Sequence, residues 1–186
     1  YCIYCNAANP ADLNLGAAYK GNSISLGGEI VINFHVALTD EAVKNEPSMQ
    51  FTMNGEVIGT AAFNEDSYDE TTKCYLYSCG VAAKEMTETV TAQMVDGNLM
   101  GTPHDYSVKQ YADTIIENRD NAYSDAAVTL TKSMLNYGAY AQQYFNYKMD
   151  NLADAGLSYT MGTVTAEDLE EYKPVITGDT SVCTFD

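Results

Sequence analysis

The first hundred residues carry the alternating apolar and polar pattern of β-strands. The clearest example runs from Ile30 to Leu38, where every second residue is apolar and the intervening positions include Asn33 and His35. Because successive strand side chains point to opposite faces, this segment has one apolar face and one mixed, partly wet face. Such strands are typical of an antiparallel sandwich or an open antiparallel sheet.

Turn signals divide this region into six or seven short strands. Asn54-Gly55 separates residues 49–53 from residues 56–58 and is the strongest two-residue hairpin signal. The remaining expected strands cover residues 13–19, 23–26, 73–82 and 89–95, the last closed by a turn at Asp96-Gly97.

Beyond Thr102-Pro103 the apolar period becomes helical. The spacing predicts a helix over residues 106–118 and a longer one over residues 125–148, with Ser124 as N-cap and Lys148 in the last turn. We expect the longer helix to be the central packing element, with Gly138 and Ala141 allowing close approach of a neighbour. Its expected buried side chains are an apolar face (Ala127, Leu130, Thr131, Met134, Gly138, Ala141, Phe145) and a tyrosine stripe (Tyr137, Tyr140, Tyr144, Tyr147).

A short helix over residues 165–172 and a lone strand over residues 181–185 complete the pattern. Strands followed by helices predict an α+β fold, an antiparallel β-sandwich or sheet of six to seven short strands followed by two to three packed helices. We expect residues 1–12 to end a cysteine-rich knuckle or linker and residues 13–175 to form the module. Residues 176–186 then lead into a following domain.

Charge excludes several partners. The 186 residues include 9 Lys or Arg and 26 Asp or Glu, for a formal net charge of −17, so phosphate backbones and anionic membrane surfaces would repel the chain. No apolar run reaches the ~20 residues of a membrane span. The chain begins at Tyr1 without a signal-peptide pattern, and we therefore expect a processed or excised piece of a longer protein.

Five cysteines give one incomplete metal motif. Cys2 and Cys5 have the spacing at which two thiolates bind one zinc ion from a tight turn, but a zinc site needs four ligands. The missing pair would lie upstream of Tyr1, or Cys2 and Cys5 are free or oxidised. Cys74 and Cys79 are about 16 Å apart in an extended strand, too far for a disulfide, and we expect both to be buried thiols.

Four segments of the chain carry a resemblance to a known family: residues 81–88, 107–112, 134–145 and 150–153, above all the Asn-Tyr-Gly-Ala sequence at 136–139. They resemble a repeat of uncharacterised function in large secreted, cell-surface proteins of Gram-positive gut and rumen anaerobes. The similarity covers roughly residues 13–175, and the opening Cys-x2-Cys is similar to the end of short cysteine-rich repeats that often precede it. The resemblance implies an extracellular location and neighbouring domains, but no activity.

No catalytic constellation stands out. His104 beside Asp105 has the order of an oriented base, but no G-x-S-x-G elbow or thiol-protease context supplies a nucleophile, and His35 is expected at the surface. Paired carboxylates mean little among 26 acidic residues. We therefore expect a protein that is not an enzyme and requires no cofactor.

Two groups of residues are candidates for ligand binding. Tyr75 and Tyr77 share one face of a strand and would form an exposed platform for a sugar. Asp66, Asp69 and Glu70 concentrate oxygen ligands in an acidic loop, where calcium or simple solvation explains the charge. The resulting hypothesis is a non-enzymatic module of a secreted or cell-surface protein for adhesion, display or ligand binding, with a glycan or protein as partner. The alternative is a carbohydrate-binding domain for polysaccharide or mucin glycans.

Overall fold

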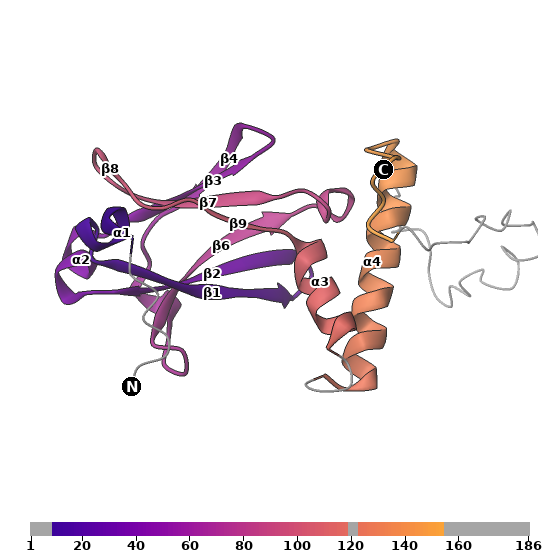
Figure 1. Cartoon of the computed structure of the whole chain (residues 1–186), viewed down its shortest axis with the longest axis horizontal. Coiled ribbons are helices and arrows are strands. Elements are labelled where there is room, and N and C mark those ends of the chain that lie inside the picture. Colours follow the sequence, from indigo (N-terminus) through magenta and orange to yellow (C-terminus); the bar gives the residue numbers. More distant parts are fainter. Residues whose placement is uncertain (1–8, 119–122, 155–186) are drawn as a thin grey trace, which may run out of the picture. The chain divides into compact units, whose positions relative to one another are not determined.

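The computed structural model describes residues 9–118 and 123–154, which form two antiparallel β-sheets followed by two main helices (Figure 1). The expected α+β class is confirmed. The strands are β1 (Ala17–Leu26), β2 (Ile30–Leu38), β3 (Ser48–Met53), β4 (Glu56–Ala61), β5 (Tyr68–Asp69), β6 (Cys74–Val81), β7 (Val90–Asp96), β8 (Leu99–Met100) and β9 (His104–Tyr106). The helices are α1 (Pro10–Asn14), α2 (Asp40–Asn45), α3 (Val108–Glu117) and α4 (Asp125–Phe145), with 3-10 turns η1 (Glu65–Ser67) and η2 (Ala83–Glu85). No helix in these residues is long and apolar enough to cross a membrane.

The strands form sheet A, in the order β1-β2-β6-β5, and sheet B, in the order β4-β3-β7-β8 with β9 also paired to β7. Every pairing in the two sheets is antiparallel. The described residues hold nine strands rather than six or seven. The additional strands β5, β8 and β9 contain only two or three residues each, too few to show an alternating pattern. The Asn54-Gly55 hairpin is confirmed, with positive φ at both residues as a type I′ turn requires.

The start of the module differs from the sequence prediction. Of the strand expected over residues 13–19, only residues 17–19 are strand, because Asn9 caps a short helix that begins at Pro10 and includes Leu13. One long strand, β1, follows from Ala17 to Leu26. Asp12 Oδ1 accepts a 2.7 Å hydrogen bond from the Thr102 backbone N–H, so the expected boundary after residue 12 falls inside an element that packs on β1 and β8.

The core lies between the two sheets. The inward side chains of β2 meet those of β3, and the Phe34 and Phe51 rings lie 5.7 Å apart. The mixed face of β2 is partly exposed, as expected, and carries a polar network around the buried Asn33. Asn33 donates to Ser25 Oγ and accepts from Ser78 Oγ, both at 2.7 Å. Burial without these partners would leave the amide unsatisfied.

The boundaries of the two main helices also differ from the periodic pattern. Residues 104–106 pair with β7, and α3 starts only after Ser107, whose side chain forms a capping box with Gln110. The Ser124 cap of α4 is confirmed, but the helix ends at Phe145 because Asn146 adopts a left-handed conformation. Lys148 therefore lies beyond the helix. It forms an ion pair with Glu88, whose side chain is only 4% exposed.

Helix α4 packs against η2 and α3 and is not the central element of the fold. The close approach expected at Gly138 is confirmed, since a Cβ there would lie 2.6 Å from Met86 Sδ. The expected apolar face and tyrosine stripe are wrong at four exposed positions: Leu130 (60%), Tyr137 (63%), Tyr144 (83%) and Phe145 (61%). The buried residues of α4 are instead Val128, Thr131, Met134, Leu135, Gly138, Ala139 and Gln142.

Candidate ligand-binding groove

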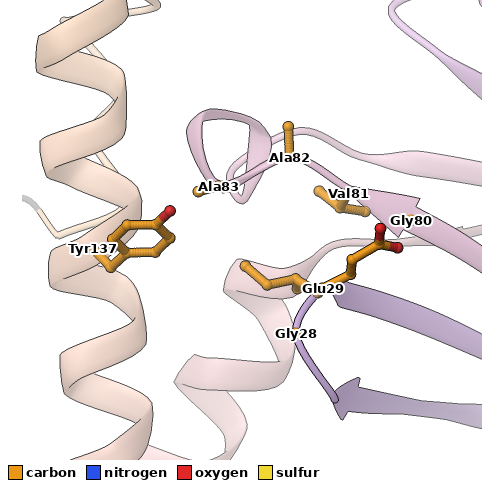
Figure 2. A pocket seen from close by; sticks show the side chains of 8 residues that line it. Gly28, Glu29, Gly80, Val81, Ala82, Ala83 and Tyr137 are labelled. Carbon is orange, nitrogen blue, oxygen red and sulfur yellow. The ribbon is translucent and has the colours of Figure 1, made fainter. Parts of the chain in front are cut away.

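A groove lies where the hairpin end of sheet A and the end of β6 face helix α4 (Figure 2). It consists of two adjoining hollows of about 360 and 260 Å³ that share Gly28, Glu29, Ile30 and Tyr137. We call it the α4 groove. Its further lining residues are Gly80, Val81, Ala82 and Ala83 in the larger hollow, and Leu26, Leu130 and Met134 in the smaller one.

Sheet pairing positions one wall of the groove. Leu26 and Ile30 are paired at the end of the β1–β2 hairpin, and the three residues between them turn through Gly28, whose φ is +100°. Ile30 in turn pairs with Val81, so the last residue of β6 lies beside the hairpin end. Glycine and alanine predominate along this wall, which leaves backbone N–H and C=O groups accessible to a ligand.

Tyr137 provides the opposite wall. Its side chain is 63% exposed, and Figure 2 shows its hydroxyl pointing toward the Ala83 side of the groove, while the Glu29 carboxylate lies on the strand side. The groove therefore combines an aromatic face, one carboxylate and exposed backbone. An aromatic face can stack on a sugar ring, and a carboxylate and backbone amides can hydrogen-bond its hydroxyls.

The groove holds no catalytic set. Glu29 is the one carboxylate among its lining residues, whereas glycoside hydrolysis requires two carboxyl groups at a fixed separation. No histidine, serine or cysteine lines it to act as a nucleophile or base.

A second cleft of about 470 Å³ opens between β4 and β6, and Cys79 lies in its wall. The thiol is 6% exposed, and burial raises its pKa to about 11. The sulfur is therefore protonated at neutral pH and a poor nucleophile. The expectation that Cys74 and Cys79 are free and buried is confirmed.

The tyrosines predicted as a glycan platform do not form one. Tyr77 is 2% exposed, points into the core, and donates a 2.9 Å hydrogen bond to the Pro47 carbonyl. Tyr75 is half-buried, with its ring 5.0 Å from both Phe63 and Tyr68. Because Tyr77 is buried and the Tyr75 ring packs against two other rings, the exposed platform is a wrong prediction.

The two histidines do not form a catalytic pair with acids. His35 is half-buried, with Nε2 2.8 Å from Ser23 Oγ. His104 stacks on Tyr19 with ring centroids 3.9 Å apart, and burial lowers its pKa despite the nearby Asp12 and Asp105. Asp105 instead accepts a 2.6 Å hydrogen bond from Thr91 Oγ1. His104 is thus a packed ring on sheet B and not an oriented base.

The acidic loop of residues 64–70 uses several of its oxygens internally. The Asp69 carboxylate accepts hydrogen bonds from Thr71 N and Thr72 Oγ1, which lower its pKa, and Glu70 forms an ion pair with Lys73. Asp66 is the middle residue of the 3-10 turn η1, and its backbone N–H donates a 3.0 Å hydrogen bond to Asn64 Oδ1. No group of three potential ligands converges anywhere in residues 9–118 and 123–154. Calcium at Asp66, Asp69 and Glu70 stays a prediction, and Cys2 and Cys5, the expected zinc ligands, lie outside the described residues.

No family model matches the chain, and searches of the curated proteins and of the solved structures also give no match. The interpretation of the groove therefore rests on its own geometry.

Sequence reasoning missed Tyr137 as a site residue because it assigned the whole tyrosine stripe to the core. A usable signal lay in the same helix. Gly138, Ala139 and Thr131 cluster on one side, and small residues mark the side at which a neighbouring element approaches closely.

Proposed function

We propose that this chain is a non-enzymatic ligand-binding module of a secreted or cell-surface protein, and that its ligand is a glycan bound in the α4 groove. The observation that carries the proposal is Tyr137, an aromatic ring 63% exposed at the edge of a hollow that also contains one carboxylate. A ring that is this exposed is available for stacking on a ligand.

Three further features support a binding module over an enzyme. The groove has a single carboxylate, the Cys79 thiol is protonated, and His104 is engaged with Tyr19. The acidic composition and the resemblance of the sequence to surface-protein repeats support the proposed extracellular setting. Neighbouring domains of the same polypeptide would then place the groove at the cell surface.

A glycan is favoured over a protein ligand by the chemistry of the groove. Its larger hollow combines one aromatic ring with exposed backbone polar groups, and the apolar side chains gather in the smaller hollow. Sugars present one apolar ring face and a rim of hydroxyls, so the same ligand can use both features. A standard protein interface would instead need 20–30 residues on each side.

The test is a glycan array probed with the whole chain, first with calcium and then with chelator. We expect retention on one glycan class, loss in Tyr137→Ala, and preserved binding in Tyr137→Phe, which keeps the ring. Tyr68→Ala is the matched control, because Tyr68 is a partly exposed tyrosine on β5, outside the groove. A wild-type chain that retains no glycan, or a Tyr137→Ala variant that binds unchanged, would overturn the proposal. Loss on chelation would assign a cation to the loop of Asp66, Asp69 and Glu70.

A further inference from the structure

The outer face of α4 carries a line of exposed large side chains that continues beyond the groove. Leu130, Tyr137 and Tyr144 are seven residues apart and 60%, 63% and 83% exposed. Seven residues make almost two helical turns, so the three lie on one side of the helix with successive positions about 10.5 Å apart along its axis. We call these three residues the outer stripe. Leu130 and Tyr137 line the groove, and Tyr144 lies one step further along.

The outer stripe is uncharged, although the chain as a whole is strongly acidic. The only charged residues of α4 are Asp125 and Lys132, and both lie about a third of a turn or more away from the line of Tyr137. The whole chain has a formal charge of −17. A polyanion would therefore be repelled by the rest of the protein and would gain no ion pair on the stripe.

The Tyr144 ring is held in place by its neighbours. It packs edge-on against Phe145, with ring centroids 5.0 Å apart and an interplanar angle of 88°. Phe145 in turn lies beneath the ammonium group of Lys84, 5.4 Å from the ring centroid. Lys84 follows Ala83, which lines the groove, in η2. Tyr144 is therefore connected through Phe145 and Lys84 to η2, the short element whose Ala83 lines the groove together with Tyr137.

A second copy of the chain fits the stripe less well than a sugar chain does. A stable protein interface buries about 800 Å² on each partner. The outer stripe offers three side chains along one helix, and two copies would each bring a charge of −17. Tyrosine also differs from the leucine of helix-pairing seams, because its hydroxyl suits a hydrated ligand.

We infer that the ligand of the α4 groove is an extended, uncharged polysaccharide that continues along α4, stacking on Tyr137 and Tyr144. The separation of about 10.5 Å along the helix axis corresponds to roughly two sugar units of an extended chain. This inference rests on the proposed function, and it narrows the ligand from glycans in general to neutral polymers. Sialylated or sulfated mucin glycans are excluded by charge.

The test is calorimetric titration of the whole chain with neutral oligosaccharides of increasing length. The probes are cello-, xylo- and manno-oligosaccharides from the disaccharide to the hexasaccharide, with polygalacturonate and sialylated mucin as anionic probes. We expect affinity for one neutral series to rise with length until both rings are covered. Tyr144→Ala should lower affinity for the longest member about tenfold and leave the disaccharide unchanged. Tyr144→Phe should bind as the wild type does.

The outcomes separate this inference from the proposed function. Affinity could be equal at all oligosaccharide lengths, with Tyr137→Ala weakening binding and Tyr144→Ala leaving it unchanged. This result would overturn the extended ligand but keep the α4 groove as the binding site. Preference for polygalacturonate or sialylated mucin would overturn the neutral class and likewise retain a glycan-binding module. If no probe binds, this inference is overturned. If the glycan array also shows no binding, the proposed function is overturned as well. Circular dichroism of each variant checks that the fold is preserved.

Discussion

The two faces of α4 contrast in a way that composition does not suggest. The inner face buries Gly138, Ala139 and the amide of Gln142, whereas the outer face exposes Tyr137 and Tyr144. Burial here depends on how closely η2 and the segment after the helix approach, and large rings do not fit at that distance. The contrast teaches that the inner face is needed for folding, and that the rings outside are available for another role.

Among the polar side chains of α4, the largest effect is expected at Gln142. Its side chain is fully buried, donates to the Asn151 carbonyl at 2.8 Å, and accepts from the Ala153 N–H at 2.7 Å. Gln142→Leu would leave both backbone groups unpaired, at a cost of about 3 kcal/mol in the free energy of unfolding. Equilibrium urea denaturation measures it. Gln143→Leu, the same change one residue along, should alter stability by no more than about 0.5 kcal/mol. If both variants lose the same free energy of unfolding, the buried hydrogen bonds of Gln142 make no special contribution to stability.

A smaller loss is expected at Gly138. Alanine there would gain about 1 kcal/mol of helix propensity. Its Cβ, however, would lie 2.6 Å from the sulfur of the buried Met86 and 3.2 Å from the Ala83 carbonyl oxygen. We expect overpacking to prevail, with a net loss of about 1–2 kcal/mol. The control is Gly59→Ala, where a Cβ meets no atom within 4 Å. Stabilisation by Gly138→Ala in the same denaturation experiment would show that α4 can move away from η2.

Local physics accounts for what could be predicted from the sequence. The alternation of β2, the Asn54-Gly55 turn and the Ser124 cap each depend on neighbouring residues, and all three occur in the structure. Strand β9 was not predicted, because its three residues are too few to show an alternating pattern, and its last residue, Tyr106, was assigned to the following helix. Helical periodicity likewise does not indicate which of the two apolar stripes of α4 packs against the rest of the protein.

The α4 groove had no sequence signal of its own. Its walls come from the β1–β2 turn, the end of β6 and the middle of α4, which lie some fifty residues apart along the chain. The tertiary fold alone brings Glu29 and Tyr137 to one hollow. Tyr75 and Tyr77 looked better as a platform because their two-residue spacing places them on one face, but that face is covered.

The pH dependence of stability should depend on His104, in the β-sandwich, and not on the outer face of α4. Burial lowers the pKa of His104 in the folded chain below its ordinary value of about 6.5. The unfolded chain then binds more protons just below that pH, so the unfolding free energy falls as pH decreases through the window. Melting temperatures at pH 7.5 and 5.5 measure the slope. His104→Phe, which keeps a ring against Tyr19, should reduce the slope, whereas Tyr144→Ala should retain it. An unchanged slope in His104→Phe would assign the titration to other groups.

The smallest effect on stability is expected on the outer stripe itself. Tyr137→Ala and Tyr144→Ala should each change the free energy of unfolding by no more than about 0.5 kcal/mol, as exposed side chains usually do. Leu135→Ala, on the buried face of the same helix, should cost about 2–5 kcal/mol.

Urea denaturation of these three variants distinguishes the side chains of α4 that stabilise the fold from those that are available for binding. If Tyr144→Ala destabilises as much as Leu135→Ala, the outer stripe is packed in solution, and sedimentation would identify a second copy as its cover. If Tyr144→Ala leaves stability intact and weakens binding of long neutral oligosaccharides, the ring contributes to recognition alone. Because such a ring exposes apolar surface to water without stabilising the fold, this second outcome would support the proposed ligand as the reason that the ring is exposed.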